Sequence, residues 1–104
     1  MNRIVYGLIS LVFAGTHVTG ASAADAANGK ILAQRWCAAC HVVASDQQIA
    51  NGQAAPFSAI GKTPDLDAGK LALFLLVPHP KMPDMALSRA EAADLAAYIV
   101  SQGR

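Results

Sequence analysis

Both cysteines of the chain lie in one short segment, Cys37-Ala38-Ala39-Cys40-His41. Cysteines in this arrangement serve four kinds of chemistry: a structural disulfide, half of a zinc site, a dithiol redox pair, or the attachment of haem. On a helical turn, thiols at i and i+3 lie on one side, where both can reach two vinyl groups along one edge of a porphyrin. The histidine one position on can then present its imidazole to the iron. This C-x-x-C-H spacing is the recognised haem-attachment pattern.

The other three interpretations have less support in the rest of the chain, although none of them is excluded at this point. A disulfide between Cys37 and Cys40 would close a loop too small to constrain the unfolded chain much. Zinc needs four ligands, and outside the motif residues 24–104 contain only His79 as a further histidine or cysteine. A thioredoxin-like redox pair requires a βαβ context, which this sequence does not offer.

The N-terminal residues have the pattern of a secretory signal. Arg3 supplies a positive charge, residues 4–15 (IVYGLISLVFAG) form an apolar run too short to span a membrane, and residues 21–23 (ASA) fit the small-x-small cleavage rule. We therefore expect a signal peptide over 1–23, cleavage near Ala23 and export to the periplasm, which leaves one domain over 24–104. An uncleaved N-terminal anchor is the alternative.

The exported part is small and formally neutral. Arg3 is the only charged side chain within 1–23, so residues 24–104 hold seven Lys and Arg against seven Asp and Glu. Without a basic stripe, nucleic-acid binding has no electrostatic support, and we expect no stable membrane span after cleavage. A domain of about 80 residues is usually marginal in stability without a disulfide, a metal or a cofactor. We therefore expect a bound group in the core.

A first helix is predicted over residues 26–38. Asp25 or Asn28 is its candidate cap, and Gly29 is its one poor helix former, which suggests a close backbone approach. Residues 42–63 then lose all periodicity apart from a short helical turn near 57–60. So long a connection in a small domain is expected to wrap around something.

A second helix is predicted from Pro64 or Asp67 to Leu76, with Thr63 as the cap of the earlier start. Residues 77–87 follow as a stiff, extended loop, because three prolines exclude both a helix and a central strand.

The last helix has the clearest signals. Ser88 and Glu91 form a capping box, apolar residues recur on one face, and Gly103 supplies the stop. No segment alternates convincingly at period two. The predicted fold class is therefore all-α.

In this order the elements resemble a small class I c-type cytochrome over nearly all of residues 24–104. The resemblance rests on an N-terminal helix, the C-x-x-C-H motif, a long loop, a Met-Pro loop and a C-terminal helix with Leu95-x-x-Tyr98. It implies a cytochrome c-like fold of three to four helices around one covalently bound haem c. Cys37 and Cys40 would form the thioethers, and His41 would be the proximal iron ligand.

The resemblance also implies a second iron ligand. The stretch MPDMALS resembles the Met-Pro-x-x-x-Leu-Ser segment that precedes the last helix of the family, and this selects Met82 as the ligand opposite His41. Prolines on both sides of Met82 would hold this weak, neutral ligand in place. Met85 is expected to fill a gap against an apolar surface. Met85 and His79 are the alternative ligands.

Three more positions gain a role from the resemblance. Pro56 matches a family proline whose backbone carbonyl accepts from Nδ1 of the axial histidine, which would fix the tautomer and orientation of His41. Gly29 falls where the first helix closely crosses the last one, against Tyr98. Trp36 is expected on the haem edge or the helix pair, with ordinary core packing as the alternative.

These expectations lead to electron transfer rather than catalysis. An iron with side-chain ligands on both sides has no vacant position for substrate, and the chain shows no convincing acid–base pair or nucleophile. We expect a periplasmic mono-haem cytochrome, a monomer or a subunit of a hetero-complex, that carries single electrons between redox partners such as a dehydrogenase, reductase or oxidase. The alternatives are a haem subunit permanently docked in such a complex, and a haem enzyme or gas sensor with an open or displaceable sixth ligand.

Overall fold

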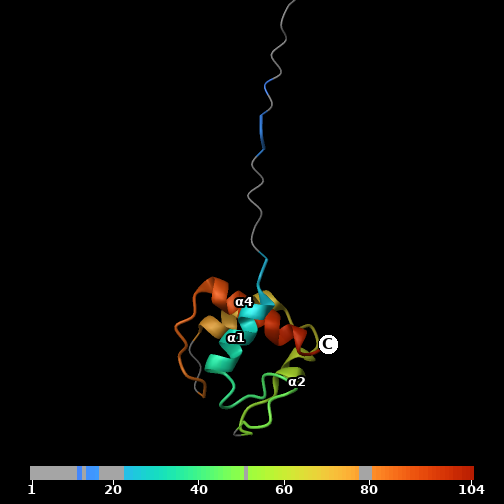
Figure 1. Ribbon diagram of the computed structural model, residues 1–104, viewed down its shortest axis with the longest axis vertical. Coiled ribbons are helices and arrows are strands. Elements are labelled where there is room, and N and C mark those ends of the chain that lie inside the picture. The colour runs from blue at the N-terminus through green and yellow to red at the C-terminus, as the bar shows by residue number, and fades with distance from the viewer. Residues whose placement is uncertain (1–11, 13, 17–22, 51, 78–80) are drawn as a thin grey trace, which may run out of the picture.

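A computed structural model describes residues 12, 14–16, 23–50, 52–77 and 81–104. These residues form four helices and no strand: α1 (Ala26–Trp36), α2 (Phe57–Gly61), α3 (Ala68–Leu76) and α4 (Arg89–Ser101). Helix α4 packs against each of the other three, and α1 and α4 are seen packed together in Figure 1. The fold is all-α, as predicted, with its last helix at the centre.

Helix α1 begins where the sequence predicts and ends slightly earlier. The Asp25 carboxylate accepts hydrogen bonds from two backbone N–H groups of the first turn, which confirms it as the cap. The last helical residue is Trp36 rather than the predicted Ala38, because Cys37 already begins the turn that carries the cysteine motif. The motif therefore lies just beyond the helix.

The crossing of α1 and α4 is a backbone contact at Gly29, as predicted. A Cβ atom on Gly29 would overlap the carbonyl oxygen of Asp94 and would lie 2.8 Å from the Cβ of Tyr98. Beside this contact, the Asp94 carboxylate accepts from the backbone N–H of Asp25 at 2.7 Å and from the side-chain amide of Asn28 at 2.9 Å. Close packing and hydrogen bonds together fix how the two helices cross.

Helix α3 confirms the later of its two predicted starts. Asp67 is its cap, and its carboxylate accepts from a backbone N–H of the first turn. Thr63 does not cap the helix and Pro64 does not begin it, so that part of the prediction is wrong. The reason is local: Asp65 has φ 58°, a left-handed backbone conformation that cannot continue a right-handed helix.

Both ends of α4 are fixed. At the start, the Ser88 hydroxyl accepts from Glu91 N–H at 3.0 Å and the Glu91 carboxylate accepts from Ser88 N–H at 2.9 Å, which confirms the capping box. At the end, Gly103 follows the helix and packs against α2. A Cβ on Gly61 would lie 2.5 Å from the backbone nitrogen of Gly103. This second glycine contact holds α2 against the turn that follows α4.

Two predictions fall partly outside the described residues, the first of them for the most part. The signal peptide covers 1–23, most of which the structure does not describe, and the proline-rich loop includes residues 78–80, which it also does not describe. Described residues 81–87 of that loop are not helical, as predicted. Within the described part of the chain, no helix combines the length and apolar character that a membrane span requires.

Replacing Gly29 by alanine should destabilise the fold, because the added methyl group would push α1 away from the Asp94 carbonyl. We expect a loss of about 1–3 kcal/mol in the free energy of unfolding, measured by chemical denaturation. Gly69→Ala is the matched control, since a Cβ there meets only an Asp67 carboxylate oxygen at 3.1 Å and alanine is the better helix former. Equal losses in both variants would contradict a tight crossing.

Glu91 should make the fold sensitive to acid. Its pKa is lowered by hydrogen bonds from the backbone and then the side chain of Ser88. When the pKa of a carboxylate is lower in the folded chain than in the unfolded chain, the carboxylate stabilises the fold at any pH above the unfolded pKa. This stabilisation is lost as the pH falls through the pKa of the folded state. Glu91→Gln keeps an acceptor but does not titrate. Its melting temperature should therefore drop less steeply than that of the wild type on acidification through the glutamate range; parallel curves would contradict this.

Candidate haem site

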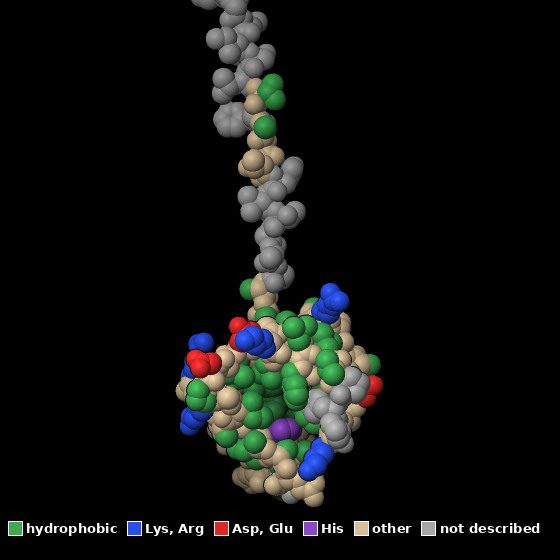
Figure 2. All heavy atoms as spheres, turned by 180° about the vertical axis from the view of Figure 1, so that it is seen from behind, with side chains coloured by type: hydrophobic (Ala, Val, Ile, Leu, Met, Phe, Trp, Pro, Cys, Tyr) green, Lys and Arg blue, Asp and Glu red, His purple; other side chains and the backbone are tan. Residues whose placement is uncertain are grey.

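An apolar cavity of about 430 Å³ opens beside the cysteine motif. In Figure 2 it is a hollow ringed mainly by hydrophobic side chains, with a histidine inside it. A smaller cavity of about 90 Å³ adjoins it towards the core and shares part of its lining. Residues that line both cavities are Cys37, His41, Ile60, Phe74 and Met82.

The turn after α1 brings the motif side chains to this cavity. The carbonyl oxygen of Cys37 accepts from the backbone N–H of Cys40 at 3.1 Å and from that of His41 at 2.9 Å. Both cysteines and the histidine therefore line one space. Cys37 is buried, and this burial, followed by the nearby Cys40 thiol, raises the pKa of Cys37 to about 11. Its thiol is thus protonated at neutral pH.

The His41 ring has a defined orientation and tautomer. Its Nδ1 lies 2.5 Å from the carbonyl oxygen of Ala55. A carbonyl can only accept, so Nδ1 carries a proton, and in the neutral imidazole Nε2 is then the nitrogen with the lone pair. The ring of Phe57 packs against the imidazole at a centroid distance of 5.3 Å. This is the arrangement in which a histidine offers Nε2 to a metal.

The carbonyl that orients His41 is not the predicted one. Pro56 was expected to supply it, but the acceptor is the preceding residue, Ala55. The physical reason is that Pro56 is the cap of α2, and its own carbonyl accepts from the backbone N–H groups of Ala59 and Ile60. The expected hydrogen bond to Nδ1 thus exists, one residue earlier in the chain.

The two methionines of the loop before α4 lie in different surroundings. Met82 lines both cavities, facing the same space as His41. Met85 is buried in the hydrophobic core, where it is only 7% exposed, which matches its predicted role as a gap-filler. His79, the other alternative ligand, lies outside the described residues. Of the described candidates, Met82 is the one that lines the cavities.

The donors around the cavity fit a haem. Two thiols, one imidazole with an available Nε2 and one thioether meet in a space whose walls are otherwise mostly apolar. Cavities of this size and lining are usual for cofactors. Trp36 lines this cavity and is 38% exposed, so it is not an ordinary core residue. Among the described residues no three His, Cys, Asp or Glu side chains cluster as they would around a bare metal ion.

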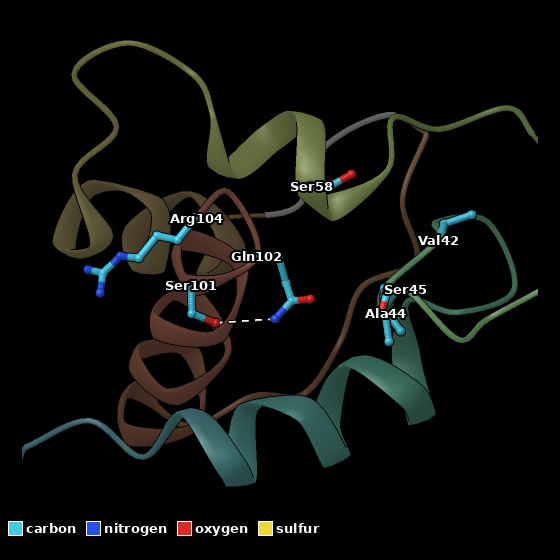
Figure 3. A pocket seen from close by; sticks show the side chains of 8 residues that line it. Val42, Ala44, Ser45, Ser58, Ser101, Gln102 and Arg104 are labelled. Carbon is cyan, nitrogen blue, oxygen red and sulfur yellow. Dashed lines mark hydrogen bonds between the residues drawn. The ribbon is translucent and has the colours of Figure 1, made fainter.

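A separate, more polar cavity of about 370 Å³ lies between residues 42–45 and the C-terminal end of α4 (Figure 3). Its lining includes Ser58, Ser101, Gln102 and Arg104, and the Ser101 hydroxyl accepts from the Gln102 amide at 3.3 Å. None of its lining residues is a cysteine, histidine or methionine, so this cavity offers none of those donors to haem iron.

Sequence reasoning missed the residues that hold the chain just after the motif. The Tyr98 hydroxyl in α4 donates to the carbonyl of Val43 at 2.7 Å. Burial, followed by the charge of Asp46, raises the pKa of Tyr98, so the hydroxyl keeps its proton and can donate. The side chain of Gln47 also bonds to this segment. The Tyr98 contact joins residues 55 positions apart, and no short motif marks Gln47 or its partners.

Comparison with known proteins agrees with the site. Residues 26–103 match the family model described as "Cytochrome c". The protein "Cytochrome c-552" of Bradyrhizobium diazoefficiens is 48% identical over 101 residues, which is 97% of each chain. No solved structure matches the chain significantly. With both the family match and this level of identity, the chain belongs to the cytochrome c family, whose members bind haem c covalently and transfer electrons rather than act as enzymes.

Proposed function

We propose that Cys37 and Cys40 form thioethers to one haem and that His41 and Met82 bind its iron from opposite sides. The observation that carries this proposal is that all four side chains line one cavity. It is supported by the hydrogen bond between His41 Nδ1 and Ala55, which leaves Nε2 as the available donor.

The residues around the cavity suit a carrier of single electrons. Haem c, when bound, supplies reversible one-electron exchange, and a methionine ligand raises its reduction potential relative to two histidines. Two side-chain ligands leave no position for a substrate. The apolar side chains of Ile60, Leu71 and Phe74 line the smaller, adjoining cavity and exclude water there, which favours the less charged, reduced form.

We also propose that the mature chain, residues 24–104, works in the periplasm and exchanges electrons with a dehydrogenase, reductase or oxidase. The signal pattern of residues 1–23 supports export. The cavity opens at the surface, where Trp36 is 38% and Phe74 51% exposed, so that one edge of a bound haem would lie within reach of a partner. The formally neutral charge of 24–104 provides little long-range steering.

Met82 should be required for the thioether-to-iron charge-transfer band of the oxidised holoprotein. Met82→Ala should abolish this band and let the reduced protein bind CO rapidly, because one axial position opens. Met85→Leu is the matched control, since its side chain is buried in the core and the change conserves volume. Loss of the band only in Met85→Leu would reverse the assignment. Rapid CO binding by the wild type would favour a gas sensor or haem enzyme.

The intact mass of the protein, expressed in a host that matures c-type cytochromes, should equal one haem plus a chain that begins near Ala24. Cys37→Ala and Cys40→Ala should each keep at most one thioether, which shifts the pyridine haemochrome spectrum towards that of a haem with one intact vinyl group. A mass that includes residues 1–23 would instead indicate an uncleaved anchor. A wild-type chain without covalent haem would contradict the proposal.

A further inference from the structure

Gln47 lies outside the C-x-x-C-H motif, but its side chain reaches back to it. Its Nε2 donates to the carbonyl oxygens of Ala38 and His41, each at 2.9 Å, and to that of Ile49 at 3.0 Å. Its Oε1 accepts from the backbone N–H of Val43 at 2.9 Å. The two amide hydrogens therefore serve three carbonyls, and one side chain ties together the backbone before, at and after the histidine.

The segment that Gln47 holds is anchored to two other elements. The carbonyl of Val42 accepts from the backbone N–H of Phe57, the first residue of α2, at 2.9 Å. The carbonyl of Val43 accepts from the Tyr98 hydroxyl of α4, and Val43 is only 2% exposed. Gln47 thus joins the motif turn to a part of the backbone that cannot shift without breaking contacts to α2 and α4.

The carbonyls of Ala38 and His41 need this partner for a structural reason. They lie beyond the end of α1, where no further helical turn supplies N–H donors. Water could satisfy them, but it would not fix their direction. With Gln47 in place, His41 is held at both ends: its main chain by the Gln47 amide and its ring by the Ala55 carbonyl.

We propose that Gln47 is a positioning residue for the axial histidine, and that it sets the direction in which His41 presents Nε2 to the haem iron. The inference rests on the proposed ligation by His41. Groups that orient a metal-bound histidine also tune its strength as a donor. When the Gln47 side-chain amide is removed, the Nδ1–H bond to Ala55 weakens and the imidazole becomes a poorer donor to ferric iron. The reduced state is then relatively more stable, so the reduction potential rises.

The test compares holoprotein variants by NMR and by spectroelectrochemistry. Gln47→Ala should change the pattern of paramagnetically shifted haem-methyl resonances, which reports the orientation of the axial ligands. It should also favour reduction by up to about tenfold, which for one electron is about 59 mV. Gln48→Ala is the matched control, an exposed neighbour of the same type, and should leave both quantities as in the wild type.

Gln47→Glu keeps the test decisive if the alanine variant folds poorly. This change preserves the shape and the acceptor for Val43 N–H but removes both N–H donors, so the haem-methyl resonances should change as in Gln47→Ala. Only the resonances are compared for this variant, because its added negative charge itself stabilises ferric iron and opposes the shift in potential. A Gln47 variant with lower thermal stability but with wild-type methyl resonances and potential would overturn the inference and leave the proposed function intact. Absence of histidine ligation in the wild type would overturn both, and it is measured before any variant is compared.

Discussion

The structure depends first on the crossing of α1 and α4 at Gly29. A backbone-to-backbone approach of this kind tolerates no side chain, so the angle and register of the two helices are set there rather than by adaptable apolar packing. The position of the cysteines follows, because they lie in the turn that directly follows α1. Tyr98 lies at the same crossing and holds the Val43 carbonyl. One contact therefore places both the motif and the segment behind it.

The imidazole is connected to this crossing through a short series of rings. His41 packs against Phe57, and Phe57 packs edge-on against Tyr98 at a centroid distance of 6.2 Å. Edge-on aromatic contacts have a preferred geometry, so a displacement of α4 would also shift the ring of Phe57 and, through it, the ring of His41. Phe57 also begins α2, whose far end meets Gly103. The short helix thus links the ring series to the C-terminal end of α4.

The sequence was informative where structure is decided locally. The capping box, the short turn at α2 and the cysteine motif each need only a few neighbouring residues, and the resemblance to a family supplied the order in which they occur. The start of α3 was less certain, since a single left-handed residue, Asp65, excludes the Thr63 cap. The orienting carbonyl was assigned one residue too late, because a matching proline does not say which carbonyl faces the ring. Gln47 and the Gly61–Gly103 contact had no local signal at all.

Within the described residues α1 and α4 are the first and last helices, and their contact therefore cannot form until nearly all of residues 26–101 are available. A chain that is delivered with its N-terminus first presents Cys37 and Cys40 well before residues 89–101 arrive. During that interval the back of the cavity has no α4 to close it. The arrival of α4 then completes the core in which Cys37 is buried. The topology thus makes the wall behind the cysteine motif the last part of the core to form.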